Sequence, residues 1–559
     1  MNPKSEPLVL GKPLFRDERL AAVAAKLGTL AAWQQTLSER SAVGAAQAVS
    51  GDFAIGLRDP QGHVFLAVDR FAMQTLCYRV VDGNLHFARR ADELADAEPQ
   101  IDTQAIFDYL YFHVIPSPRT IYKDVFRLPA GHCAWFEGGH LTVAPYWVPS
   151  FKEPPAASGT LKELCAQFRS LLRDAVSKRM DRNKPACFLS GGTDSSTVAG
   201  MIQSCGATAS TYSIGFEAEG YDEMAYARLA ARHFGARHHE YYLKPDDLVQ
   251  TIPAVAGHFD QPFGNSSALP AFFCARMARD DGVSTLLAGD GGDELFGGNS
   301  RYAKQRVFGW YGQVPAWARL ALIEPVVDRT ALQIAPLIRK AASYVEQAKV
   351  PMPDRLQMYN LLLRLTPSRV LTPALLAQVD ADGPLAQQRQ VWASAVTPSW
   401  LNRTLAFDWR YTLAESDLPK VMGTAQLAGL EVAFPMLDEA LLDFSLGLPL
   451  EYKLKGQQLR WFFKEALRGF LPDEILSKKK QGFGLPFGVW TLRHDGLKQF
   501  AVASLTSLAE RGIVRVDFID VLLKVHMHEH AGYYGEMVWI LMMLEQWLQQ
   551  RAPSFKVAT

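Results

Sequence analysis

Short apolar and alternating runs dominate the chain between about residues 50 and 147. These runs are Asp52–Leu57, Val64–Val68, Leu76–Val81 and Leu85–Ala88. A period of two over four to eight residues is typical of strands. Turn-forming residues separate the runs at 59–62 and 82–84, as expected between neighbouring strands. The first part of the chain is therefore predicted to be β-rich.

The pattern changes after a polar, proline-containing segment at 152–159, which has the composition of a linker. Thr160 and Glu163 have the spacing of a capping box, which predicts a helix beginning there. Apolar residues then recur on one helical face. They are Leu161, Leu164, Cys165, Phe168, Leu171, Leu172, Ala175 and Val176.

Strands and helices alternate beyond that helix. Strands are predicted at Ala186–Leu189, Ala209–Gly215 and Ser284–Ala288. This alternation indicates an α/β fold with a parallel sheet, in which ligands bind at the carboxyl ends of the strands. After about residue 303 the pattern is almost wholly helical. A chain of 559 residues is longer than a single hydrophobic core usually accommodates. We therefore expect two domains, at residues 1–150 and 160–555.

Composition narrows the functional classes. Lys+Arg and Asp+Glu balance at 58 each, so bulk charge gives no reason to expect a nucleic-acid or membrane-surface partner. The six cysteines have no CxxC spacing and are expected to be buried free thiols in a reducing compartment. The apolar run Met537–Leu544 is too short to cross a membrane, and the first residues lack a secretion signal. We expect a soluble cytoplasmic protein.

The stretch Phe188–Ser196 carries the strongest chemical signal. An apolar strand enters a turn of small residues, SGGTDSS, and a helix follows it. Successive backbone N–H groups and the positive end of the helix favour a bound anion. Asp194 places a carboxylate inside this anion-binding turn, which a magnesium ion bridging to phosphates would explain. The Walker pattern GxxxxGK[ST] is absent from the sequence.

A second glycine-rich turn follows the strand predicted at Ser284–Ala288. It carries Asp290, Asp293 and Glu294. Carboxylates gathered on such a turn repel one another unless a cation or a transferable proton relieves them. Taken alone, this segment could equally be an acidic surface turn. The run Thr211–Phe216 is similarly ambiguous, because a strand meeting a polar loop needs no ligand.

Together these segments resemble the synthetase domain of the asparagine synthetase family, and the loop SGGTDSS resembles that of the ATP pyrophosphatases. The motifs stand in the family's order over residues 160–548. They are SGGTDSS (190–196), TYSIGF (211–216), GYDEMAYARLAARHFGARHHE (220–240), DQPFGNSSALP (260–270), AGDGGDELFGG (288–298), LEVAFPMLD (430–438), LPLEYK (448–453), KKKQGFGLP (478–486) and EMVWILMMLEQW (536–547).

The resemblance implies a fold and a set of ligands. An N-terminal domain similar to Ntn hydrolases, shortened here, would precede the ATP-pyrophosphatase domain, whose C-terminal part is large and helical. ATP and Mg²⁺ are the implied cofactors, with Asp194 and Asp293 sharing the metal. The residues implied to hold the phosphates of ATP are Ser190, Gly191, Gly192, Asp194, Ser195 and Ser196.

The resemblance also implies roles around the reacting centre. Ile214 and Gly289 would flank the nucleoside. Asp290 stands where the family has a carboxylate near the reacting atoms. Lys480 would stabilise charge on departing pyrophosphate, although without the family it would simply belong to a solvated run of three lysines.

The N-terminal part departs from the glutamine-hydrolysing pattern. Members of that kind begin Met-Cys-Gly-Ile, whereas this sequence begins Met-Asn-Pro-Lys, and asparagine has no comparable nucleophile. The RGPD and NGEIYN segments are missing, and Ala72, Gln74 and Thr75 replace the usual Gly, Arg or Lys, and Pro. Recognisable remnants persist at 50–59, 67–71 and 128–132. We expect an inactive glutaminase-type domain kept as a scaffold.

A second departure lies in the segments VMGTAQ (421–426) and LEVAFPMLD (430–438). Met422, Gly423 and Ala433 stand where the family has an acid and two bases. The lost charges favour a larger or less polar substrate than aspartate.

The favoured function is an AMP- and pyrophosphate-forming amide or lactam synthetase that does not hydrolyse glutamine. β-Lactam synthetases and lasso-peptide macrolactam cyclases also lack the nucleophilic cysteine. β-Lactam synthetases carry a tyrosine at the position of Asp290, so the cyclase-like branch fits better. The alternatives are asparagine synthesis from free ammonia or from a separate glutaminase, and a non-catalytic regulatory homologue. The expected partner is a small molecule or peptide with a carboxylate and an amine; contact with a precursor peptide or partner enzyme stays open.

Overall fold

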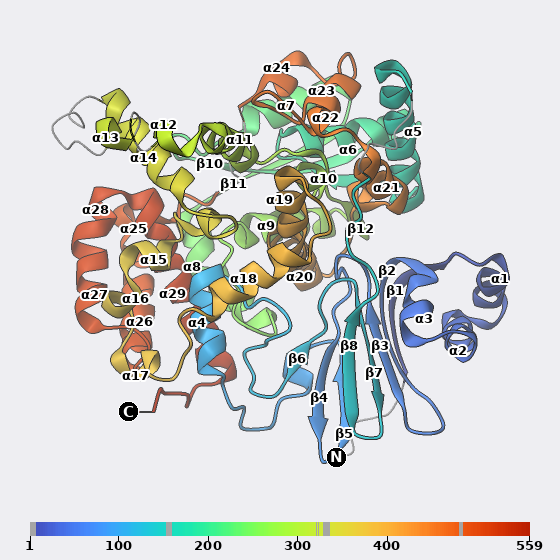
Figure 1. Ribbon diagram of the computed structural model, residues 1–559, viewed down its shortest axis with the longest axis horizontal. Helices are drawn as coiled ribbons and strands as arrows, with labels where there is room; N and C mark the ends of the chain where they lie inside the picture. The colour runs from blue at the N-terminus through green and yellow to red at the C-terminus, as the bar shows by residue number, and fades with distance from the viewer. Residues whose placement is uncertain are drawn as a thin grey trace.

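The computed structural model describes residues 7–152, 159–319, 321, 324–327, 336–479 and 484–558. Its N-terminal domain contains a five-stranded antiparallel sheet in the order β1-β2-β3-β7-β8 (Figure 1). The strands are β1 (Leu8–Phe15), β2 (Val49–Arg58), β3 (Val64–Val68), β7 (His132–Glu137) and β8 (His140–Pro145). The strands predicted at 52–57 and 64–68 are therefore present.

Both faces of this sheet are covered. Phe53 and Ile55 of β2 pack with the helices α1 (Glu18–Leu27), α2 (Thr29–Glu39) and α3 (Ala42–Gln47), around the buried Trp33. Ala54 points to the opposite face, into a core shared with the small sheet β5-β4-β6. That sheet contains β5 (Asn84–Ala88), β4 (Cys77–Val81) and β6 (Phe126–Arg127). Burial on both faces explains why these runs are apolar without strict alternation.

Helix α4 (Thr103–Phe112) joins the two domains, and the strand pattern did not predict it. Asp102 caps its first turn by accepting the N–H of Gln104 at 2.9 Å. The Tyr109 hydroxyl donates to the carbonyl of Ile540 in the C-terminal helix at 2.9 Å. A helix that is apolar nearly all round is buried against other elements, and here those elements belong to the second domain.

The second domain is built on a parallel sheet in the order β11-β10-β9-β12-β13. Its strands are β9 (Ala186–Phe188), β10 (Ser210–Phe216), β11 (Arg237–Leu243), β12 (Thr285–Leu287) and β13 (Glu431–Ala433). Leu286 and Leu287 face opposite cores, so helices cover both sides of the sheet. The α/β class with a parallel sheet is confirmed.

One layer of helices contains α5 (Leu161–Arg179), α6 (Thr193–Ser204) and α7 (Met224–His233). The capping box predicted at the start of α5 is present, because Thr160 and Glu163 bond to each other's backbone N–H groups. The opposite layer contains α8 (Pro245–His258), α9 (Ala268–Asp280) and α20 (Leu418–Ala428). Together the layers fix the carboxyl ends of the strands at one rim.

The rest of the domain is mostly helical, as predicted (Figure 1). Its longer elements are α11 (Ser300–Gln313), α14 (Pro336–Lys349), α18 (Gly383–Ser394), α19 (Trp400–Asp408), the π-helical segment η5 (Trp409–Asp417), α21 (Glu439–Gly447), α25 (Phe487–Arg493), α26 (Asp495–Glu510) and α29 (Ala531–Arg551). The run Met537–Leu544 lies fully buried within α29. Within the described residues, no helix has the length and apolar character needed to cross a membrane.

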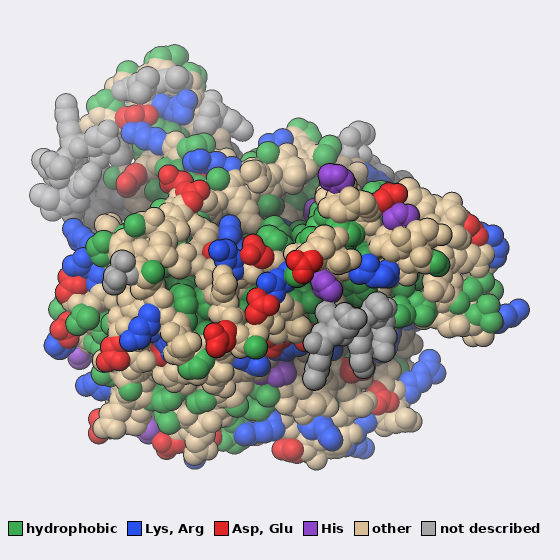
Figure 2. Space-filling view, turned by 90° about the horizontal axis from the view of Figure 1, so that it is seen from below, with side chains coloured by type: hydrophobic (Ala, Val, Ile, Leu, Met, Phe, Trp, Pro, Cys, Tyr) green, Lys and Arg blue, Asp and Glu red, His purple; other side chains and the backbone are tan. Residues whose placement is uncertain are grey.

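All six cysteines are free thiols, and five of them are buried. The face shown in Figure 2 carries acidic and basic side chains interspersed with one another. This mixture agrees with the balanced composition of the sequence.

Candidate active site

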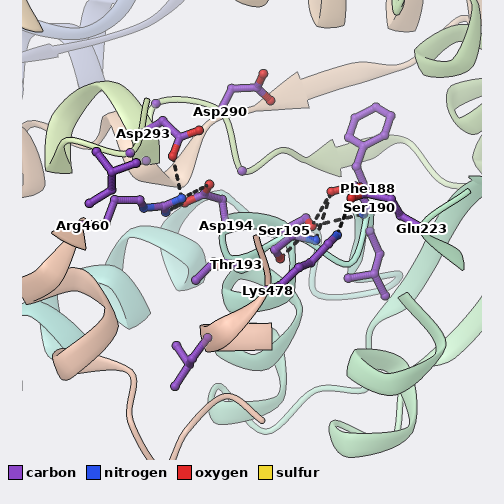
Figure 3. A pocket seen from close by; sticks show the side chains of 18 of the residues that line it. Phe188, Ser190, Thr193, Asp194, Ser195, Glu223, Asp290, Asp293, Arg460 and Lys478 are labelled. Atoms are coloured by element: carbon purple, nitrogen blue, oxygen red, sulfur yellow. Dashed lines mark hydrogen bonds and ion pairs between the residues drawn. The ribbon is translucent and has the colours of Figure 1, made fainter. Parts of the chain in front are cut away.

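A cavity of about 1060 Å³ opens at the rim formed by β9, β10 and the turn after β12 (Figure 3). Phe188 and Ile214 contribute apolar surface, and the turn Gly289–Glu294 contributes carboxylates. The cavity lies where a parallel α/β sheet is expected to bind its ligand. Its volume exceeds that of most pockets for small ligands.

The phosphate loop has the geometry of an anion site. Gly191 adopts φ +71°, and a Cβ there would come within 2.5 Å of the backbone nitrogen of Ala227. The twelve-residue helix α6 follows directly, and its N-cap residue Gly192 provides no side-chain cap. The N–H groups of the first turn thus remain open to a bound anion. The Ser190 and Ser195 hydroxyls lie 3.1 Å apart beside them.

Arg460 joins the two carboxylates predicted to share magnesium. Its Nη1 donates to Asp194 Oδ2 at 2.8 Å and to Asp293 Oδ1 at 2.6 Å, and Nη2 also contacts Asp194. The guanidinium lies 4.3 Å from the Phe463 ring centroid, and the two carboxylates raise the pKa of the buried Arg460. A positive charge is therefore already fixed between Asp194 and Asp293.

The same geometry tests whether magnesium fits. Asp194 and Asp293 converge on a single nitrogen, so their oxygens can approach one cation. Two carboxylates together with phosphate oxygens are a donor set that Mg²⁺ prefers. No group of three or more His, Cys, Asp or Glu side chains suited to a metal exists among the described residues. The residues fit a metal that arrives with the nucleotide rather than one held by protein alone.

A second charged group lines the cavity from η5 and α20, near Asp290. Lys420 Nζ bonds to Asp417 Oδ1 at 2.9 Å, and Asp417 and Asp290 raise the pKa of Lys420 against its burial. Burial raises the pKa of Asp290 to about 6, although Lys420 opposes the rise. Asp290 is thus close to the point where it can either hold or accept a proton near neutral pH.

A third pair closes the phosphate side of the cavity. Lys478 Nζ lies 2.7 Å from Glu223 Oε1 and 3.4 Å from the carbonyl of Gly191. Lys478 thereby contacts the edge of the phosphate loop, and Figure 3 shows it beside Glu223. Lys480, the residue predicted to act on pyrophosphate, lies outside the described residues.

The structure brings most of the predicted residues together. Those that line the cavity are Ser190, Gly192, Asp194, Ser195, Ile214, Gly289, Asp290 and Asp293. Gly289 also permits close packing, because a Cβ there would come within 2.9 Å of the Ser195 nitrogen. Gly191 shapes the loop from behind, and Ser196 is fully buried and is not among the lining residues. The individual roles of all these residues remain predictions.

Met422, Gly423 and Ala433, the positions with lost charges, lie outside the cavity lining. Gly423 packs against the Phe259 ring, and Met422 and Ala433 pack on the apolar core. Their lost charges therefore give no information about the acceptor.

Sequence reasoning missed Arg460, the Asp417–Lys420 pair and the Glu223–Lys478 pair. The pair Asp417 and Lys420 could have been found, because two charged residues three positions apart interrupt an otherwise apolar helix. Arg460 offered no such signal. It follows a two-stranded hairpin of β14 (Leu454–Lys455) and β15 (Gln458–Leu459), and its carboxylate partners are distant in sequence.

Comparison with known proteins decides the family. The profile for asparagine synthase matches residues 167–549, which is more than half of the chain. The chain belongs to the asparagine synthase family. A profile for a glutamine amidotransferase domain matches residues 36–147. This asparagine synthase family member is accordingly a carbon–nitrogen ligase of a family that forms amide bonds with ATP.

Several curated proteins are similar over most of the chain. Asparagine synthetase [glutamine-hydrolyzing] 1 of Bacillus subtilis is 24% identical over 90% of this chain and 78% of its own length. A putative asparagine synthetase [glutamine-hydrolyzing] of Mycobacterium bovis is 25% identical over 90% and 76%. Amidase chyE of Penicillium rubens is 23% identical over 79% and 70%. Relatives in this family thus carry more than one kind of name.

Proposed function

We propose that the protein is an ATP-dependent amide or lactam synthetase that forms AMP and pyrophosphate without hydrolysing glutamine. It would adenylate a substrate carboxylate and join it to an amine, in the manner of the lasso-peptide cyclases that it resembles. The proposal is carried by the nucleotide cavity, which is lined by paired acidic and basic side chains. Beside it, both cysteine thiols of the N-terminal domain are buried.

The cavity residues have defined tasks in this reaction. The substrate carboxylate attacks the α-phosphorus, the bond to the bridging oxygen breaks, and pyrophosphate leaves with added negative charge. Arg460, Lys478 and the N–H groups at the start of α6 supply fixed positive charge at that side of the cavity. Magnesium held by Asp194 and Asp293 would neutralise further phosphate charge.

The second step joins the amine to the activated carboxyl group. The amine nitrogen attacks the acyl carbon, AMP departs, and one proton of the amine must be accepted. Asp290, with its pKa raised to about 6, lies on the turn beside the phosphate loop and is our candidate for holding that proton or orienting the amine. Lys420 faces Asp290 and limits how far that pKa rises.

The two cysteines in the described part of the N-terminal domain are poorly suited to glutamine hydrolysis. Its two cysteines, Cys77 and Cys133, are 0% and 2% exposed. Burial raises the pKa of Cys133 to about 11 and raises that of Cys77 well above its ordinary value. Only a thiolate is nucleophilic, so these residues support a structural role.

Product analysis tests the proposal. The protein is incubated with Mg-ATP and a panel of carboxylates and amines, including aspartate with ammonium, and phosphorus NMR follows the products. We expect AMP and pyrophosphate with at least one pair. ADP with inorganic phosphate would contradict the proposal, and asparagine as the sole product would favour the plain asparagine synthetase alternative. Glutamate release from glutamine would contradict the claim on the N-terminal domain.

A further inference from the structure

A second cavity of about 500 Å³ adjoins the nucleotide cavity. Two chain segments place consecutive residues against both of them, and a third connects them through a hydrogen bond. Ser300 and Asp417 line the nucleotide cavity, while their neighbours Arg301 and Ser416 line the second one. The third segment links them through Ser267, which lines the nucleotide cavity, and Ser266, which bonds to a residue of the second. The two cavities are therefore separated by little more than a single layer of chain.

Aromatic side chains form part of the walls of the second cavity, beside polar ones such as Gln357, Asn360 and Gln388. They come from both domains: Phe112 from α4 of the N-terminal domain, Phe407 from α19, Tyr411 from η5 and Tyr533 from α29. The Phe112 and Tyr411 rings stack with centroids 5.3 Å apart and an interplanar angle of 9°. Such walls favour an aromatic or large apolar group. The N-terminal domain thus supplies part of a pocket.

Glu536 on α29 is the acidic residue of this cavity. Its Oε2 accepts a 3.4 Å hydrogen bond from the Ser266 hydroxyl, and no ion pair joins it to any described residue. Burial raises the pKa of Glu536 to about 7. A carboxylate held out of water without a cation favours a ligand that brings one.

The other charged groups lining the cavity do not supply that cation. Arg301 is paired with the buried Asp408 at 2.8 Å. Burial lowers the pKa of His113 to about 4, so the imidazole is neutral at physiological pH. The hydroxyls of Tyr411 and Tyr533 are buried and have no hydrogen-bond partner among the described residues. The cavity thus combines one buried carboxyl group that has no ion-pair partner among the described residues with two phenol groups that have no hydrogen-bond partner there.

We propose that this cavity binds the amine substrate of the ligase, a primary ammonium group carried on an aromatic or similarly large apolar body. Glu536 pairs with the ammonium, and the aromatic walls enclose the body. Before the amine can attack, the ammonium must give one proton to the Glu536 carboxylate, which leaves the neutral nucleophile. Because Glu536 bonds to Ser266 and the neighbouring Ser267 lines the nucleotide cavity, the amine pocket lies next to that cavity. The assignment of this ligand as the acylated amine rests on the proposed function, but the binding itself does not.

Calorimetry without ATP tests the pocket with three probes at pH 8, where Glu536 is ionised. We expect 2-phenylethylamine to bind at least about tenfold more tightly than 2-phenylethanol, which lacks the charge, and more tightly than butylamine, which lacks the ring. Glu536→Gln should weaken 2-phenylethylamine binding about tenfold, and the exposed control Glu510→Gln should leave it unchanged. Equal binding of amine and alcohol, or unchanged binding by Glu536→Gln, would overturn the proposal.

A second variant guards against indirect effects on folding. Thr412→Phe fills the second cavity from η5 without touching the nucleotide cavity, so it should exclude 2-phenylethylamine and keep Mg-ATP binding. Thermal melting of both variants checks that they fold. If 2-phenylethylamine still binds to Thr412→Phe with wild-type affinity, its site is elsewhere. Because these titrations contain no ATP, they separate failure of this proposal from failure of pyrophosphate formation.

Discussion

The nucleotide cavity and the N-terminal domain both hold acidic groups away from water, but they satisfy them differently. In the N-terminal domain, Asp69 is fully buried and accepts four backbone N–H groups at 3.0–3.3 Å, those of Phe53, Phe71, Met73 and Gln74. In the nucleotide cavity, Asp194 and Asp293 are bound to one side chain, the guanidinium of Arg460. A carboxylate that is hydrogen-bonded to backbone N–H groups stabilises the fold. A carboxylate that is paired with a side chain can exchange that partner for a ligand.

The boundary between the regions shows what the N-terminal domain contributes. Glu415 of η5 is 4% exposed and binds Arg127 of the N-terminal domain at 2.8 Å and Arg410 at 2.6 Å. The Trp147 and Trp409 rings stack beside it with centroids 6.2 Å apart. The same π-helical segment ends at Asp417 in the nucleotide cavity. The domain therefore supports the segment that carries part of the site.

Removing Asp194 should have the largest effect on the catalytic region. Asp194→Ala should abolish pyrophosphate release, with a loss of at least about a thousandfold, because the magnesium that would neutralise the phosphate charge would lose one of its two carboxylate ligands. Phosphorus NMR with an active substrate pair measures it. Asp174→Ala, an exposed change on α5, serves as the control. Turnover that survives in Asp194→Ala would remove our assignment of the metal position.

Arg460→Met should destabilise the folded protein unless a metal replaces the guanidinium. Two mostly buried carboxylates would lose their cation, which costs up to about 5 kcal/mol when one partner of a buried pair is removed. Thermal melting with and without magnesium chloride measures the effect. We expect Mg²⁺ to raise the melting temperature of Arg460→Met more than that of the wild type. An equal response of the two proteins would show that metal and guanidinium do not share the position.

The sequence predicted the phosphate loop and the acidic turn because each is contiguous. Gly191 and Asp194 stand in one turn, and Asp290 and Asp293 in another, so local rules of backbone geometry and charge apply to them. Arg460 could not be predicted in this way, since 167 residues separate it from Asp293 and only the folded hairpin brings them together. Helix α4 was missed for a related reason. Its apolar residues face another domain, so no amphipathic stripe marks it.

Substitutions relative to the family's sequence pattern could be interpreted only where they affect the local backbone geometry. Ala72 replaces a glycine of the family pattern and still adopts φ +50°, a conformation that favours glycine. The turn therefore keeps its shape despite the substitution. Met422 and Gly423, in contrast, pack against apolar residues. Their position relative to the cavity depends on the whole fold and could not be obtained from one sequence.

Two glutamates at the domain boundary allow the stability contribution of a buried ion pair to be compared with that of a more exposed one. Glu415→Gln should lower the free energy of unfolding by about 3 kcal/mol, because Arg127 and Arg410 would remain buried without their counter-charge. Glu439 also crosses the boundary, to Arg70 at 2.7 Å, but its side chain is 29% exposed. Glu439→Gln should therefore change stability by about 1 kcal/mol or less. Urea denaturation monitored by circular dichroism compares them; equal losses would contradict the distinction.

Asp290→Asn should alter how stability depends on pH. Burial raises the pKa of Asp290 to about 6 from its ordinary value of 3.8, so between these values the folded state holds a proton that the unfolded state has lost. Its contribution to stability is therefore largest below pH 4 and falls as pH rises to about 6. Thermal melting at pH 5 and pH 7.5 should show the variant gaining stability relative to wild type at the higher pH. A constant difference would indicate an unshifted carboxyl group.

The smallest effect is expected in the N-terminal domain, from replacing Cys77 and Cys133 together by alanine. Each change removes a buried sulfur, which costs about 1 kcal/mol, but neither thiol takes part in our proposed reaction. Pyrophosphate release should be unchanged, and glutamate release from glutamine should be absent in both proteins. Iodoacetamide should modify the partly exposed Cys205 of the native protein well before either buried thiol. Glutamate release that is present in wild type and lost in the double variant would instead make this domain an active glutaminase, and the contrast between a reactive and a supporting region would not hold.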